Sequence, residues 1–190
     1  MNKKRVLILL GGKSGEHEIS IISATSVFKS LDRNKYDVSL VGIDKTGKWF
    51  VPDEKALLSQ SSNPKKVQMI PTKNKVCLLP FENKGELMSV GEHKTSSASL
   101  HGFDVVFPVL HGPHGEDGTL QGLLQLSGLP FVGSGVLGSA LCMDKDVAKR
   151  VLRDAGIPVV PFIAIKRSEF KKNPAHFLMK AKNEHCCVPP

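Results

Sequence analysis

The chain has 190 residues, which is enough to bury a hydrophobic core in one large domain or in one domain and part of a second. Its formal net charge is +8, but residues 166–184 contribute half of that charge, with six Lys or Arg and two Glu. This uneven charge argues against a uniformly basic nucleic-acid surface, and no apolar run approaches the roughly 20 residues needed to cross a bilayer.

The four cysteines, Cys77, Cys142, Cys186 and Cys187, show no C-x-x-C spacing. No signal peptide is expected, because nothing that precedes Lys3 has the form of one. Reduced thiols and a cytoplasmic location are therefore expected. The adjacent pair Cys186 and Cys187 has poor geometry for a metal ion and is expected to be an oxidation-prone tail.

Residues 5–10 (RVLILL) are almost continuously apolar, which predicts a strand covered on both faces of a parallel sheet. After a glycine-rich turn, residues 16–31 carry an apolar stripe that begins at Ile21, while the serines mostly face elsewhere. This pattern predicts a helix. Residues 37–44 (DVSLVGID) then predict a second strand, so the chain opens with a βαβ unit.

The pattern weakens from residue 52 to residue 100, which is expected to be an exposed, mobile and irregular excursion. Within it, the short apolar island at 76–80 is interpreted as an edge strand or a hairpin arm. Order returns with a predicted strand at 103–110 and a predicted helix at 119–128.

Three further elements are predicted toward the carboxyl end. They are a short strand at 130–134, a helix over 143–156 that stops at Gly156, and a new strand at 160–165. The alternation of strands and helices predicts an α/β fold with an open, doubly wound, mainly parallel sheet. The ligand crevice of such a sheet lies beyond the carboxyl ends of its strands.

The first glycine-rich turn, residues 11–16, matches neither of the common phosphate-binding loops. A P-loop has a glycine five positions before its final Gly-Lys-Ser, and here that position is Leu7. The dinucleotide fingerprint G-x-G-x-x-G is also absent, because Lys13 and Glu16 stand where glycines belong when the motif is counted from Gly11.

Glu16 is a candidate ligand-binding carboxylate in this turn. It follows Gly11, Gly12 and Gly15, so the backbone can approach a small ligand closely and the carboxylate can accept hydrogen bonds from an amino group. An acid that only complements the helix dipole is an equally open interpretation. His17 is expected to be solvated or to cap the helix.

The second glycine-rich turn, HGPHGEDG at residues 111–118, carries the candidates His111, His114 and Glu116. Imidazole and carboxylate groups are usual zinc donors, but a histidine pair without a second His or Cys cluster more often places a substrate, so no metal site is predicted. An imidazole at a strand end can donate to a carboxylate, which favours His111. Glu116 and Asp117 precede the next helix, so simple capping is their alternative interpretation.

Lys145 stands where the helix predicted over 143–156 begins, shortly after three glycines. A lysine in this place can reach an anion in a crevice. Most helical lysines are solvated, however, and this is the expectation for Lys149 of the same helix.

Three stretches resemble the D-alanine:D-alanine ligases, the ATP-dependent enzymes that make the dipeptide terminus of the peptidoglycan precursor. They are LLGGKSGEHEIS at 9–20, LHGPHGEDGTLQGLLQLSGLPFVGSGVLGSALCMDK at 110–145 and AGIPVVPF at 155–162. The resemblance implies a cytoplasmic cell-wall enzyme of the ATP-grasp class that works as a homodimer. Its substrates would be D-alanine and ATP with Mg²⁺, and it would bind neither nucleic acid nor membrane.

The same resemblance implies a division of the chain into two domains. Residues 1–143 would be a Rossmann-like, pre-ATP-grasp domain that holds the first D-alanine, and residues 144–190 would be the truncated start of the central ATP-grasp domain. ATP would phosphorylate one D-alanine carboxylate, and the amino group of the second D-alanine would attack the acyl phosphate. Charge neutralisation around the transferring phosphoryl group is the physical core of that step.

Site residues are implied where the motifs match. Glu16 would act in catalysis by binding the ammonium group of the first D-alanine. His111 would help to place the same substrate near its carboxyl group, and Glu116 would support the loop or the histidine. Lys145 would reach the ATP phosphates.

The carboxyl end departs from the family pattern. Residues 170–190 carry no cluster of Asp or Asn fit to hold magnesium, so the Mg²⁺ ligands are expected outside this chain, which alone could not complete catalysis. The alternative is a stand-alone D-amino-acid-binding module without ligase activity. A nicotinamide-dependent dehydrogenase is disfavoured, because the glycine fingerprint is absent.

Overall fold

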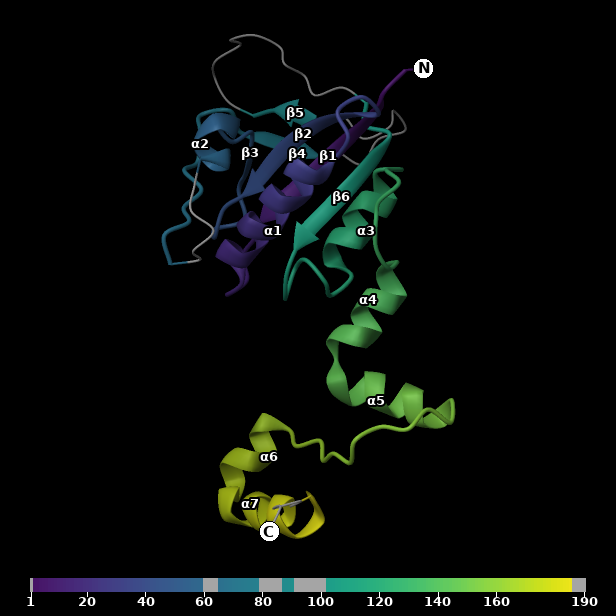
Figure 1. Cartoon of the computed structure of the whole chain (residues 1–190). Helices are drawn as coiled ribbons and strands as arrows, with labels where there is room; N and C mark the ends of the chain where they lie inside the picture. Colours follow the sequence, from purple (N-terminus) through teal and green to yellow (C-terminus); the bar gives the residue numbers. More distant parts are fainter. Residues whose placement is uncertain (1, 60–64, 79–86, 91–101, 186–190) are drawn as a thin grey trace. The chain divides into compact units, whose positions relative to one another are not determined.

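The computed structural model describes residues 2–59, 65–78, 87–90 and 102–185 (Figure 1). The chain divides into two compact units, Met1–Met143 and Asp144–Pro190. The pair Cys186 and Cys187, predicted to be an oxidation-prone tail, lies outside the described residues.

A four-stranded sheet forms the centre of the first unit. Its strand order is β3-β2-β1-β6, in which β1 pairs in parallel with both β2 and β6 and the short β3 pairs antiparallel with β2. The strands are β1 (Lys4–Gly11), β2 (Tyr36–Ile43), β3 (Trp49–Phe50) and β6 (Val105–Leu110). The three longer strands confirm the strands predicted from their apolar runs.

Helices cover both faces of this sheet. Side chains along each strand alternate between the two faces, so each face has its own set of apolar side chains. On β1, Leu7 and Leu9 pack in a core cluster with α3 (Thr119–Leu126), whereas Ile8 packs in a second cluster with α1 (His17–Ser30). The sheet is therefore doubly wound and mainly parallel, as predicted. Figure 1 shows α1 and α3 beside the sheet with β1 and β6 between them.

The order of the strands reverses at β1. The chain leaves β1 through α1 to reach β2 on one side, and it later enters β6 on the other side. Gly11 at the end of β1 is the register partner of Leu110 at the end of β6. The two glycine-rich turns therefore start next to each other, at the place where open α/β sheets bind ligands.

Most described residues of the segment 52–100 are exposed, as expected, but part of the segment is regular. It contains α2 (Glu54–Leu58) and an antiparallel hairpin of β4 (Val76–Leu78) and β5 (Leu87–Ser89), so the predicted hairpin arm is confirmed for β4. Its buried residues join both core clusters: Leu57, Val67, Val76, Leu78 and Leu87. A few isolated apolar residues are enough to dock the segment, although its average composition is polar.

The strand predicted at 130–134 is reduced to one parallel bridge between Phe131 and Val106. Val106 N–H donates to Pro130 O, and Val132 N–H donates to Val106 O. Gly133 then adopts a φ of 126°, a backbone conformation that ends the pairing. The glycines that follow lie at the start of α4 (Val136–Met143), a helix that was not predicted.

The second unit contains three helices in its described part: α5 (Lys145–Asp154), α6 (Arg167–Lys172) and α7 (Pro174–His185). The end of α5 is confirmed, because Gly156 has a φ of 73° and Ile157 N–H donates to Leu152 O. The strand predicted at 160–165 is wrong, since the unit offers it no other strand among the described residues. No helix in the described ranges is long and apolar enough to span a membrane.

Candidate functional site

Ser20 joins the three elements that carry the site. Its side chain is fully buried, and its Oγ accepts a hydrogen bond of 2.8 Å from Gly11 N–H and donates to Val109 O. One hydroxyl therefore connects the end of β1, the end of β6 and the first turn of α1. This connection fixes where the turn that contains Glu16 begins.

His17 supports the same turn from the other side. It is only 5% exposed, and its Nδ1 lies 2.7 Å from Gly12 O, so this nitrogen carries the proton and donates it to the carbonyl. The expectation that His17 is solvated or caps the helix is wrong. Its spacing with Ile21, Ala24 and Phe28 places it on the buried face of α1.

Glu16 occupies the N-cap position of α1, but its side chain makes no capping hydrogen bond. Its Oε2 instead lies against the second loop, where a Cβ added to Gly112 would be 2.9 Å away. Ser14 Oγ accepts a hydrogen bond of 3.1 Å from Glu16 N–H and so sets the direction of the turn. The exposed carboxylate thus faces the junction of the two loops, which the simple capping interpretation does not explain.

The loop 111–118 is closed by Glu116. Its Oε2 accepts a hydrogen bond of 2.6 Å from Gly112 N–H, and its own N–H donates to Gly112 O. Gly112 has a φ of 71°, a conformation that a residue with a side chain rarely adopts. The carboxylates of Glu16 and Glu116 therefore both lie next to Gly112.

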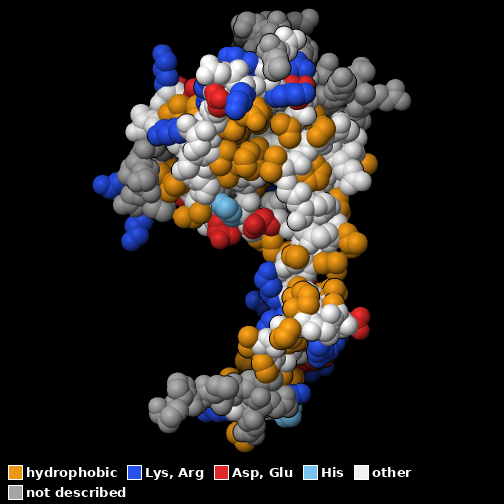
Figure 2. Space-filling view, turned by 45° about the vertical axis from the view of Figure 1, so that its right-hand side comes forward, with side chains coloured by type: hydrophobic (Ala, Val, Ile, Leu, Met, Phe, Trp, Pro, Cys, Tyr) orange, Lys and Arg blue, Asp and Glu red, His pale blue; other side chains and the backbone are white. Residues whose placement is uncertain are grey.

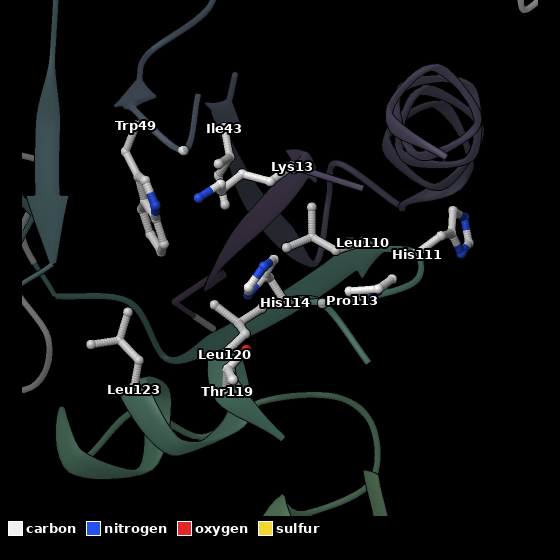
Figure 3. A pocket seen from close by; sticks show the side chains of 13 residues that line it. Lys13, Ile43, Trp49, Leu110, His111, Pro113, His114, Thr119, Leu120 and Leu123 are labelled. Atoms are coloured by element: carbon white, nitrogen blue, oxygen red, sulfur yellow. The ribbon is translucent and has the colours of Figure 1, made fainter. Parts of the chain in front are cut away.

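His111 begins this loop, immediately after β6. Its Nε2 lies 3.2 Å from Ser23 Oγ on α1, and Figure 3 shows its ring directed toward that helix. The structure thus brings three predicted site residues, Glu16, His111 and Glu116, to the same edge of the sheet. In Figure 2, acidic side chains and a histidine lie beside one another at the edge of the first unit.

Asp117 holds the second half of the loop. Burial by itself raises the pKa of its carboxyl group, but hydrogen bonds from the Thr119 hydroxyl and from the N–H groups of His114 and Thr119 outweigh this effect and lower the pKa below 3.8. Asp117 is therefore a structural anion, which matches the capping interpretation for this residue.

Lys145, the predicted phosphate-contacting residue, belongs to the second unit. It is the exposed first residue of α5, and Asp144 caps this helix by accepting hydrogen bonds from Asp146 N–H and Val147 N–H. The helix start predicted for Lys145 is confirmed. Its role toward ATP remains a prediction.

In the part of the chain that the structure describes, no group of three or more His, Cys, Asp or Glu side chains could hold a metal ion. Figure 3 shows the reason at the second loop, where the rings of His111 and His114 point in different directions. The described residues therefore offer no set of three such donors for Mg²⁺ or Zn²⁺.

The structural roles of two residues of the site, His17 and Ser20, were not predicted from the sequence. Both lie on the apolar face of α1, one turn before Ile21 and Ala24. A polar residue on that face must find a partner, because an unpaired buried polar group is costly. Their positions in the helical period were therefore the signal that could have revealed them.

A doubly wound α/β domain with two glycine-rich loops where the strand order reverses belongs to the class of small-ligand-binding Rossmann-like domains. The family described as "D-ala D-ala ligase N-terminus" matches residues 5–134 of this chain. The chain belongs to the D-alanine–D-alanine ligase family.

Curated relatives agree with this assignment. The chain is 44% identical over 169 residues to the D-alanine–D-alanine ligase A of Chromobacterium violaceum, a match that covers 89% of this chain and 45% of that protein. It is also 44% identical over 168 residues to the corresponding ligase A of Escherichia coli K12, covering 88% and 45%. The chain thus spans about half the length of the curated relatives it matches.

Solved structures show the same fold. The D-alanine–D-alanine ligase of Coxiella burnetii matches with a TM-score of 0.75 and 35% identity, over 95% of this chain and 49% of that one. A D-Ala:D-Ser ligase of Enterococcus faecalis matches with a TM-score of 0.68 and 33% identity, over 95% and 49%.

Proposed function

We propose that this chain is the substrate-holding part of an enzyme that joins two D-alanines in an ATP-dependent reaction for peptidoglycan synthesis. The observation that carries this proposal is the exposed Glu16 carboxylate. It makes no capping hydrogen bond and lies against Gly112, where the two loops meet. A carboxylate in this setting suits the ammonium group of an amino acid better than a phosphate.

Each candidate residue has a distinct role in this proposal. Glu16 accepts hydrogen bonds from the ammonium group of the first D-alanine. His111, whose ring is restrained by Ser23, helps to place the carboxyl end of the same substrate. Glu116 is a positioning residue, since its bond to Gly112 N–H holds the loop that carries His111.

Lys145 is the residue of this chain that we assign to the ATP phosphates, from its place at the start of α5. ATP activates one D-alanine as an acyl phosphate, which the amino group of the second D-alanine then attacks. The described residues offer no group of three His, Cys, Asp or Glu donors, and we infer that the Mg²⁺ ligands lie outside the described residues. We further infer a homodimer in the cytoplasm, and ligation that depends on the remaining half of the enzyme.

Titration calorimetry of the 190-residue chain with D-alanine tests the role of Glu16. Glu16→Gln should weaken D-alanine binding about tenfold, because one charge-assisted hydrogen bond is lost. Glu54→Gln, which changes an exposed carboxylate on α2, is the matched control and should leave binding unchanged. Equal affinity of the Glu16 variant and the unaltered chain would reject the ammonium-binding role.

A titration with ATP separates the second role from the first. Lys145→Ala should weaken ATP binding and leave D-alanine binding intact, whereas Glu16→Gln should do the reverse. If Lys145→Ala changed D-alanine binding alone, the assignment of Lys145 to the phosphates would be wrong.

A further inference from the structure

A cavity of about 230 Å³ lies on the other side of the loop 111–118. The turn between β2 and β3, the first glycine-rich turn and the start of α3 form its remaining walls (Figure 3). Most of its wall is apolar and comes from Ile43, Trp49, Leu110, Leu120 and Leu123. We call this cavity the Trp49 pocket.

The Trp49 pocket is separate from the site around Glu16. Glu16 and Glu116 are not among the residues that line it. His111 contributes to the wall, but Figure 3 shows its imidazole directed away, toward α1. The two sites therefore use opposite sides of one loop.

Lys13 supplies a positive charge to this pocket. Its side-chain stem lies over Gly47, where an added Cβ would be 2.9 Å from Lys13 Cδ, and Figure 3 shows its ammonium group directed into the space beside Trp49. Within the described ranges, no hydrogen bond or ion pair engages this ammonium group. A cation above an apolar floor is suited to a ligand that carries one negative charge.

His114 supplies a second polar group. It is the only non-glycine residue in the described part of the chain with a positive φ, 67°, and Asp117 holds its N–H at 2.8 Å. This conformation is uncommon for a residue with a side chain, and strained residues of this kind cluster at active sites and ligand clamps. Here it directs the imidazole into the pocket, on the same side as Lys13.

We propose that the Trp49 pocket binds a small carboxylate with a branched or cyclic apolar body. The apolar wall would leave the charges of a phosphate or a dicarboxylate without partners, whereas one carboxylate can face Lys13 and His114. The apolar body then packs on Trp49, Leu120 and Leu123. This proposal does not depend on the function proposed for Glu16.

Tryptophan fluorescence tests the proposal directly, because Trp49 is the only tryptophan in the chain. The probe is cyclohexanecarboxylate, and its neutral control of the same shape is cyclohexanecarboxamide. We expect a saturable change with the acid and binding about fivefold weaker with the amide, since the exposed ion pair is modest. No saturable change with the acid, or equal binding of acid and amide, would overturn the proposal.

Three variants test whether the positive charge of Lys13 binds the carboxylate. Lys13→Met should reduce acid binding to the level of the amide, while Lys13→Arg should retain it. Lys29→Met, which removes an exposed lysine from the last turn of α1, should leave it unchanged. If Lys13→Met and Lys29→Met bound the acid equally well, and both had the circular dichroism of the unaltered chain, Lys13 would not be part of the site.

Discussion

Ser20 links the ends of the two strands from which the two loops begin. Its hydroxyl satisfies a backbone N–H of β1 and a backbone C=O of β6, and it is fully buried. Ser20→Ala leaves both groups without that partner. We expect it to lower the free energy of unfolding by about 1–3 kcal/mol, as measured by urea unfolding.

Ser26→Ala is the control for this prediction. Ser26 lies on the same helix, is exposed, and donates its hydroxyl to Ile22 O within the helix. Its loss should change the free energy of unfolding by less than about 0.5 kcal/mol. Equal destabilisation by both variants would show that the bridge between the strands contributes nothing.

Asp117 gives a prediction for the dependence of stability on pH. Because the pKa of Asp117 is lowered in the folded chain, the unfolded chain binds its proton more readily. The stabilisation by this carboxylate is therefore complete above its ordinary pKa of 3.8 and is lost as the pH falls through the lower folded value. Asp117→Asn should reduce stability at neutral pH and have a smaller effect in acid.

Urea unfolding at a series of pH values measures this effect. Asp37→Asn, at an exposed position of β2, is the reference, because it removes one carboxylate without the bonds of the loop. The difference in the free energy of unfolding between Asp117→Asn and Asp37→Asn should become smaller as the pH falls. A difference that stays constant down to acid pH would contradict the assigned cause of the pKa shift.

The residues of the candidate site could be predicted only where they follow a strand. Glu16, His111 and Glu116 lie in glycine-rich turns after apolar runs, so the topology alone brings them to one edge. The contacts that hold them could not be predicted, because the bonds of Ser20 to Val109 and of His111 to Ser23 join residues 89 and 88 positions apart. Spacing along the chain carries no signal at that distance.

At the scale of elements, α5 has a cap that can be tested. Asp144 Oδ1 accepts hydrogen bonds from Asp146 N–H at 3.0 Å and Val147 N–H at 3.2 Å. Asp144→Ala should destabilise the helix by about 1 kcal/mol and speed hydrogen exchange at these two amides. Asp154→Ala, at the other end of α5, should not destabilise the helix, because an acid at a helix C-terminus is unfavourable.

The longer strands were predicted correctly because their apolar runs are long. In β1, six of the eight residues are buried in one run, and α1 has an apolar stripe from Ile21 to Phe28. The elements that were missed are short or interrupted, such as the two-residue β3 and the glycine-containing α4. The sequence at 130–134 resembles a strand, but pairing depends on neighbours that only the folded sheet supplies.

At the scale of the whole molecule, the two units differ in how much they bury. The first unit contains both core clusters, whereas α5 and α6 have no buried residue. Apolar side chains of the second unit, including Leu152, Ile157 and Phe170, are 39%, 50% and 40% exposed. An amphipathic helix gains most of its stability from packing of its apolar face, and these exposed apolar side chains are available for such packing.

The last prediction follows from this exposed surface and from the half-length match to the relatives. Joining residues 1–190 to the remaining part of the Escherichia coli ligase, at the end of the match, should give a chain that releases phosphate from ATP when D-alanine is added. The 190-residue chain alone should release none, because it spans only about half the length of the relatives it matches. Glu16→Gln in the joined chain should lower kcat/KM for D-alanine about tenfold or more and leave the KM for ATP unchanged. D-alanine-dependent phosphate release by the 190-residue chain, purified free of other ligases, would contradict the need for the second half.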